Sequence, residues 1–297
     1  MSQLLRSICF SLLFLAVISP VLGQPSTDTT DSLLRVHEVK VKVTDMAEAL
    51  TFYRDLLGLP VLSEANYPAS VLLDGEVLPL RLERTRHAAP VDYPQVSQTI
   101  LVFETADLVA TMARLKAHHV TFLTDPPEPY GFNQETGKPL GLTTKVRDPF
   151  GNVHSLVEQQ VRRDTTLTGI RIYNIGYYLP DMQAARAIYN DKLGFVPMTE
   201  NYLPAALPLL HADGSFGFML HEHRGLKPTS INYPDDTQSM IVFATSDLHA
   251  AAEALRQQGV TLLHDEPQSS PEGKYLAFRD RFGNVAEIIE RPLSSHH

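Results

Sequence analysis

The chain has 297 residues, of which 43% are hydrophobic and 20% are charged, a composition typical of a soluble globular protein of roughly two domains. Its net charge of −9 disfavours nucleic acids and anionic membrane surfaces as partners. The single cysteine, Cys9, lies in an apolar N-terminal segment. A protein that has lost this segment would contain neither a thiol nucleophile nor a thiolate metal site.

The N-terminal segment has the pattern of a cleavable leader. Residues 8–22 are apolar apart from two serines and one proline, and the run ends at Gly23. Such a run is too short to cross a hydrocarbon layer of ~30 Å as a helix. We therefore expect residues 1–23 to be a signal peptide and residues 24–32 a flexible spacer. The mature protein is then expected to be secreted or periplasmic with no membrane partner, and an uncleaved anchor is the alternative.

The rest of the chain predicts strands and helices in a fixed order. Alternating apolar and polar residues predict a half-buried strand at 39–43, followed by a helix that Asp45 caps and Gly58 ends. A second helix follows Asp107. The further strands predicted in this half lie at 69–73, 77–82, 100–103, 120–123, 143–146 and 153–157. The order of strand, helix and three strands thus occurs twice, and it recurs from Ile172 and from Met240.

The chain also repeats specific residues. Asp45-Met46 and Leu57-Gly58-Leu59 recur as Asp181-Met182 and Leu193-Gly194-Phe195, at an offset of 181 − 45 = 136. The segment 147–153 recurs at 279–285, at an offset of 279 − 147 = 132. A period this long indicates domain duplication rather than a solenoid. We expect domains at 33–161 and 168–293, joined by a polar linker.

These motifs, repeated in register, resemble the vicinal-oxygen-chelate superfamily. Its members include glyoxalase I, extradiol dioxygenases, fosfomycin-resistance enzymes and bleomycin-resistance proteins. The resemblance covers about residues 35–160 and 170–292, and it includes the Asp-Pro-x-Gly-Asn turn at 148–152. It implies an α+β fold of four βαβββ modules, paired within each half into two open eight-stranded half-barrel domains. Each domain would carry its site on the concave side of its sheet.

The resemblance also locates the family's metal positions. In the first half they fall on Glu38, Arg81, Ile100 and Ser155, and in the second on Asn174, Met219, Met240 and Glu287. Only the two glutamates are usual ligands, whereas a usable divalent site needs about three. No metal cofactor is therefore favoured, although a divalent ion (Fe, Mn, Ni or Zn) stays open. The alternative metal set is His221, His223 and Glu287, because residues two apart on a strand share a face.

The concave faces are candidate binding sites for a small molecule even without a metal. The candidate ligand-binding residues are Glu38, Arg81, Asn174, Tyr178, Met219, Met240 and Glu287. In the first half, Glu38 and Arg81 lie beside Lys40 and Lys42, and these charges either pair internally or bind an anion. In the second half, apolar side chains with a few polar groups are typical of a small-ligand site.

The leading functional hypothesis is an exported protein that binds a small organic ligand in a half-barrel cleft, without an intact metal site. A metal-dependent lyase or dioxygenase that uses the second half is one alternative, and a non-catalytic interaction module is another. No catalytic residue is assigned. The sequence contains no glycine-rich phosphate loop and no Gly-x-Ser-x-Gly motif.

Overall fold

The computed structural model describes residues 34–132, 136–161, 164–211 and 214–291. The expected signal peptide and spacer lie outside these residues. None of the helices in the described ranges is long and apolar enough to span a membrane. The described chain from residue 34 onward belongs to one compact unit.

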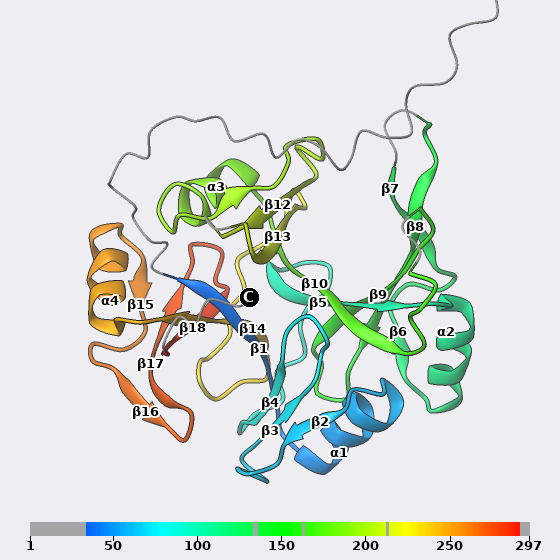
Figure 1. Ribbon diagram of the computed structural model, residues 1–297, viewed down its shortest axis with the longest axis horizontal. Coiled ribbons are helices and arrows are strands. Elements are labelled where there is room, and N and C mark those ends of the chain that lie inside the picture. The colour runs from blue at the N-terminus through cyan, green and yellow to red at the C-terminus, as the bar shows by residue number, and fades with distance from the viewer. Residues whose placement is uncertain (1–33, 133–135, 162–163, 212–213, 292–297) are drawn as a thin grey trace, which may run out of the picture. The chain divides into compact units, whose positions relative to one another are not determined.

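Four modules follow one another along the chain, each beginning with a long strand and a helix (Figure 1). The first contains β1 (Arg35–Val43), α1 (Met46–Leu50) with its π-helical continuation η1 (Thr51–Leu56), β2 (Val61–Ser63), β3 (Ser70–Leu73) and β4 (Leu80–Arg84). The second contains β5 (Gln98–Thr105), α2 (Leu108–Ala117), β6 (Thr121–Phe122), β7 (Glu128–Phe132), β8 (Pro139–Arg147) and β9 (Val153–Gln159).

The third module contains β10 (Ile170–Leu179), α3 (Met182–Tyr189), β11 (Val196–Pro197), β12 (Ala206–Leu210) and β13 (Phe216–Glu222). The fourth contains β14 (Ser239–Thr245), α4 (Leu248–Gln257), β15 (Thr261–Leu262), β16 (Gln268–Ser270), β17 (Gly273–Arg279) and β18 (Val285–Glu290). An aspartate caps the helix of every module by accepting a hydrogen bond from a backbone N–H of the first turn. The caps are Asp45, Asp107, Asp181 and Asp247.

The strands form two open sheets, each of nine strands in the described part of the chain. One sheet, named here the outer sheet only for reference, joins the first and fourth modules in the order β15-β17-β18-β14-β1-β4-β3-β2, with β16 paired to β17. The inner sheet joins the second and third in the order β11-β12-β13-β10-β5-β9-β8-β6, with β7 paired to β8. The blue strand β1 accordingly lies next to β14 of the fourth module in Figure 1, and β18 follows on the other side of β14.

This pairing corrects one expectation while the predicted fold class is confirmed. The modules do not pair within each half: β1 pairs antiparallel with β14, and β5 pairs antiparallel with β10. The physical reason is that the connection through residues 85–97 carries the chain from β4 in one sheet to β5 in the other. Side-chain periodicity specifies which face of a strand is buried, but it does not specify which strand pairs with its edge.

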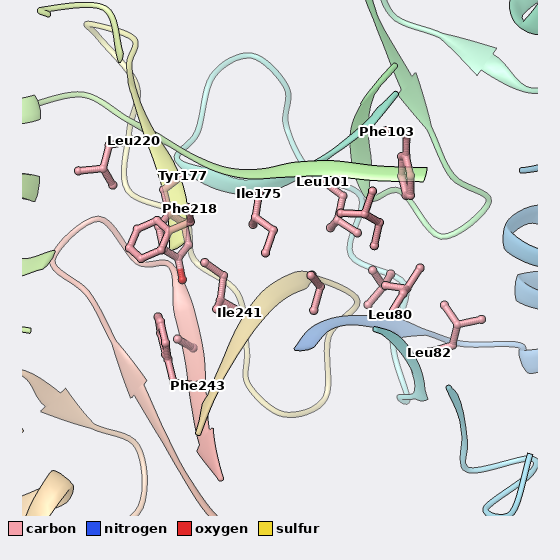
Figure 2. Packing of buried hydrophobic residues seen from close by; sticks show 14 of the residues in the cluster. Leu80, Leu82, Leu101, Phe103, Ile175, Tyr177, Phe218, Leu220, Ile241 and Phe243 are labelled. Atoms are coloured by element: carbon pink, nitrogen blue, oxygen red, sulfur yellow. The ribbon is translucent and has the colours of Figure 1, made fainter. Parts of the chain in front are cut away.

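The main hydrophobic core draws residues from both sheets. On β1, Val39, Val41 and Val43 enter this core, whereas the alternating residues face the opposite side. Figure 2 shows side chains of the two sheets meeting in one cluster. Its labelled members are Leu80, Leu82, Ile241 and Phe243 of the outer sheet and Leu101, Phe103, Ile175, Tyr177, Phe218 and Leu220 of the inner sheet. The face of each sheet that points away from this core is therefore the candidate location of a binding site.

Within each half, the two modules are joined by a buried tyrosine–aspartate bond. The hydroxyl of Tyr53 donates to Asp148 at 2.7 Å, and that of Tyr189 donates to Asp280 at 2.8 Å. Asp148 also accepts from the backbone and side-chain amides of Asn152, which confirms the predicted turn before the last strand. The repeated aspartate–asparagine motif therefore ties a helix of one module to a turn of the next.

Candidate functional site

The seven candidate ligand-binding residues are divided between the two sheets. Glu38, Arg81, Met240 and Glu287 come together on the outer sheet. Asn174, Tyr178 and Met219 lie on the inner sheet. The expectation that Met240 and Glu287 share a face with Tyr178 is therefore wrong, because β14 and β18 belong to the sheet that contains β1.

The outer sheet carries a charged face, defined as Glu38, Lys40, Lys42, Arg81, Glu83 and Glu287. Arg81 binds both carboxylate oxygens of Glu38, through Nε at 2.6 Å and Nη2 at 2.9 Å. Lys40 Nζ lies 2.5 Å from Glu287 and 2.7 Å from Glu83. These charges therefore pair internally, which was one of the two alternatives for this face.

The ion pairs shift the pKa values of the paired groups on this face. Burial alone would raise the pKa of Glu83, but the charges of Lys40 and Lys42 outweigh burial and lower that pKa to about 2. Burial opposes the charge of Lys40 as well, yet Glu287 and Glu83 raise the pKa of this lysine. The Tyr233 hydroxyl donates to the second oxygen of Glu287 at 2.9 Å. Both oxygens of Glu287 are thus engaged by donors.

The charged face does not suit the divalent metal that the family implies. Glu38 is held by a guanidinium, and Glu287 is held by an ammonium and a hydroxyl. A metal would have to displace these donors beside three cationic side chains. Met240, at the third family position, is not a ligand for such ions.

The alternative set of His221, His223 and Glu287 is not brought together. His221 and His223 lie on and just after β13 of the inner sheet, whereas Glu287 lies on β18 of the outer sheet. This prediction is wrong, because it assumed that all strands of the second half share one sheet. Within the described ranges, no three His, Cys, Asp or Glu residues are grouped so that they could hold an ion.

The inner sheet carries a second face, here called the tyrosine–lysine face and defined as Gln98, Lys145, Ser155, Tyr178 and His221. Lys145 Nζ donates to Ser155 Oγ at 2.5 Å and to the Tyr178 hydroxyl at 2.9 Å. The cation also lies 5.1 Å from the centre of the Tyr178 ring. In the part of the chain that the structure describes, no carboxylate lies within ion-pairing distance of Lys145.

Aromatic rings surround Tyr178. The His221 and His223 rings lie 4.9 Å and 4.5 Å from its ring, centre to centre. Burial, reinforced by the charge of Lys145, lowers the pKa of His221 to about 3, so this imidazole is neutral at physiological pH. Gly176 makes room for it, since a Cβ there would lie only 2.9 Å from His221 Cδ2.

Apolar side chains form the wall of the tyrosine–lysine face. Ile100, Val153 and Tyr178 are buried together. Side chains from the connecting segments pack against them: Val91, Tyr93, Leu123 and Leu226. Burial, together with neighbouring Tyr178 and Glu128, raises the pKa of Tyr93 to about 12, so its hydroxyl stays protonated. This face therefore combines an apolar wall with a few polar groups.

Gln98 adds a polar atom that has no hydrogen-bond partner among the residues that the structure describes. Its side chain is 4% exposed, and its Oε1 atom accepts no hydrogen bond in the structure. Gln98 is the cross-strand partner of Tyr178, so the two side chains are neighbours on the same face. A buried acceptor of this kind is uncommon, because most such atoms in proteins are satisfied.

Sequence reasoning missed Lys145 and Gln98 as site residues. Lys145 is directly opposite Ser155 in the β8–β9 ladder, but this register becomes visible only once the strands are paired. Of the predicted residues, Tyr178 lies at the centre of the face. Met219 lies on the adjacent strand, and Asn174 Oδ1 accepts from the N–H of Ile175 beside a β-bulge.

Comparison with known proteins places the chain in a family. The model of the Glyoxalase/Bleomycin resistance protein/Dioxygenase superfamily matches residues 35–156 and 171–288. The chain belongs to this superfamily. The predicted resemblance and the tandem duplication are therefore confirmed.

Three similar proteins share low sequence identity with this chain. A catechol-2,3-dioxygenase of Bacillus subtilis is 27% identical over 216 residues, which cover 63% of this chain and 72% of the relative. Glyoxalase I from Zea mays is similar in structure, with a TM-score of 0.60 and 15% identity over 86% of this chain and 92% of that one. A putative dioxygenase from Bacillus subtilis gives a TM-score of 0.57 at 15% identity, over 86% of this chain and 85% of that one. At these identities the structural similarity shows the fold alone.

Proposed function

We propose that this superfamily member binds a small organic ligand on the tyrosine–lysine face, and that no divalent metal takes part at the family's metal positions. One observation carries the proposal. The lysine, serine and tyrosine groups converge beside an apolar wall, where Lys145 bonds, among the described residues, to the hydroxyls of Ser155 and Tyr178 and to no carboxylate. Such a combination is typical of small-ligand sites.

The charged face is a weaker candidate for the same role. A cleft of about 650 Å³ opens beside Lys42 and Glu83. However, Lys42 and Glu83 are paired to one another at 2.7 Å. Lys40 is paired to Glu83 as well, and Arg81 is paired to Glu38. A ligand there would have to break buried ion pairs, which is costly because it exposes an uncompensated charge to a poorly hydrated environment. We assign this face a structural role.

The test of the proposed site uses matched tyrosine variants. A set of small aromatic acids, amides and amines would be screened by saturation-transfer NMR against the protein and against Tyr178→Ala and Tyr202→Ala. Tyr202 is 38% exposed and serves as the control. We expect binders that are lost in Tyr178→Ala and kept in Tyr202→Ala. The proposal is wrong if no compound binds, or if both variants respond equally.

A metal-dependent lyase or dioxygenase is the second candidate, and the likeness to a catechol-2,3-dioxygenase favours it. We expect the purified protein to carry well under one equivalent of Fe, Mn, Ni or Zn by elemental analysis, and chelators to leave its melting temperature unchanged. Glu38→Gln and Glu287→Gln separate the two candidates. Stoichiometric metal that disappears in both variants would replace the first candidate with the second.

We further propose that the protein is exported. The support is the apolar run of residues 8–22 that ends at Gly23. Mass analysis of protein recovered from the envelope or the medium of the host is expected to show an N-terminus near Gln24. Recovery of the intact Met1 form from the cytoplasm would contradict this proposal.

A further inference from the structure

We propose that the ligand of the tyrosine–lysine face is a small organic anion with a planar apolar body, and that its anionic group binds Lys145. The inference rests on the proposed function, since it names the chemical class that the same face would accept. It is carried by three features of the face: an uncompensated cation, an aromatic and apolar wall, and an unsatisfied buried acceptor.

The first feature is the charge of Lys145. On the charged face, each of Lys40, Lys42 and Arg81 contacts a carboxylate at 3.1 Å or less. Lys145, by contrast, bonds to two neutral hydroxyls. A cation against an apolar wall without a counter-charge is unfavourable. An anionic ligand would supply the missing charge through a charge-assisted hydrogen bond, which is stronger than a bond between neutral groups.

A second cation adds to the positive potential of this face. Arg147, two residues beyond Lys145 on β8 and on the same side of the strand, donates to the backbone carbonyls of Val91 and Gly151. It has no carboxylate within ion-pairing distance among the described residues. Glu128 influences Tyr93 but is not paired with either cation in that part of the chain. The local field therefore favours an anion over a cation.

The second feature is the shape and polarity of the wall. Tyr178 and the partly buried Tyr93 contribute aromatic rings, and they pack with Ile100, Val153 and the partly buried Leu123 as the apolar lining of the face. Aromatic rings prefer offset or edge-on contact with other rings, so the lining suits a planar ligand body. His221 is uncharged at neutral pH and does not compete with Lys145 for the anion.

The third feature is Gln98. Its Oε1 atom is buried and lacks a hydrogen-bond partner in the described part of the chain, and Gln98 is the neighbour of Tyr178 across the β5–β10 ladder. Leaving such an acceptor unsatisfied is unfavourable, so a ligand that also carries an N–H or O–H group would gain a further bond here. The lysine donor and the glutamine acceptor together provide two polar groups near Tyr178 that a ligand would contact.

The experiment compares three probes of similar shape and different charge: benzoate, benzamide and benzylammonium. Affinities would be measured by NMR titration of the His221 and Tyr178 ring signals in the protein, in Lys145→Met and in Lys138→Met. Lys138 is exposed, so its variant removes the same charge without altering the face. We expect benzoate to bind about tenfold or more tightly than benzamide, because a hydrogen bond to a charged group is substantially stronger. Lys145→Met should abolish this preference, and Lys138→Met should keep it.

The outcomes separate the inference from the proposed function. Equal binding of benzoate and benzamide at the His221 and Tyr178 signals would overturn the anion inference and leave the proposed function in place. A preference for benzoate that survives Lys145→Met would also overturn it. If none of the probes binds, both fail. Thermal melting would show whether Lys145→Met is folded, and Lys145→Gln provides a second variant that retains hydrogen bonding without the charge.

Discussion

Lys40 is the residue whose loss should destabilise the charged face most. It is 8% exposed and bridges Glu287 and Glu83 at 2.5 Å and 2.7 Å. Lys40→Met would leave the buried carboxylate of Glu287 and the partly buried carboxylate of Glu83 each short of a partner. Breaking a buried ion pair from one side costs about 3–5 kcal/mol. We therefore expect the free energy of unfolding at pH 7 to fall by about that amount.

The pKa of Glu83 gives an independent magnitude. Its lowering from 4.5 to about 2 corresponds to roughly 3–4 kcal/mol of stability, at ~1.4 kcal/mol for each pKa unit, and Lys40 shares this contribution with Lys42. Because the folded-state pKa lies below the unfolded one, this stability is present above about pH 4.5 and is lost as the pH falls toward 2. The difference between the protein and Lys40→Met should therefore narrow as the pH decreases through this window.

The assay is urea unfolding followed by circular dichroism, because the chain contains no tryptophan. The double variant Lys40→Met/Glu287→Gln provides the control. Removing the second charge should recover part of the loss, so the two changes should not be additive. A loss below 1 kcal/mol at pH 7, or one that is the same at pH 7 and pH 3, would refute the reasoning.

Two further predictions concern the contact between the third and fourth modules, where the Tyr189 hydroxyl donates to Asp280. Tyr189→Phe removes the buried donor to Asp280 and should cost about 1–3 kcal/mol, measured as a fall in the free energy of unfolding. Gly283→Ala should be more destabilising than Gly259→Ala, measured by melting temperature. Both glycines have positive φ, but a Cβ on Gly283 would lie 2.1 Å from the Thr229 carbonyl oxygen, whereas nothing lies within 4 Å at Gly259. Equal falls in melting temperature for Gly283→Ala and Gly259→Ala would contradict the steric argument.

The features that the sequence could predict are local ones. The alternation along β1 specifies which residues enter the core, and Asp45 and Asp107 predict the starts of two helices. The turn at Asp148 follows from the hydrogen bonds that one aspartate can make to nearby amides. Each of these features depends on residues within one module, so neighbouring positions in the sequence are enough to specify it.

The site depends instead on which strands meet, and this is where prediction from the sequence failed. The sequence groups Glu287 with Tyr178 and the two histidines, since all four lie in the second half of the chain. Because the first module pairs with the fourth and the second with the third, Glu287 lies in a different sheet from Tyr178 and the histidines, beside Lys40. The same pairing brings Lys145 of the second module against Tyr178 of the third. Neither contact has a local signature, because the partner residues are distant in the sequence and only the strand register joins them.

The crossed pairing leads to a last prediction, about the two halves as separate fragments. In 33–161, β1 lacks its partner β14 and β5 lacks its partner β10, so two long strands each have an open edge. Open edges of this kind favour association with another chain. Two copies can satisfy both edges by pairing β1 of one with β5 of the other, in a closed two-fold arrangement. We therefore expect 33–161 and 168–293 each to form dimers or aggregates, rather than the independently folded domains that the duplication alone would predict.

Sedimentation and thermal melting of the separate and mixed fragments would test this expectation. An equimolar mixture should form a one-to-one complex, because it restores both the β1–β14 and the β5–β10 ladders. The complex should melt cooperatively and at a higher temperature than either fragment, since only in the complex is the core shared by the two sheets complete. Cleavage of the intact protein within residues 162–168 should leave the halves associated for the same reason. A monomeric 33–161 fragment with a cooperative melt would show that each half closes on itself, and the crossed pairing would then be wrong.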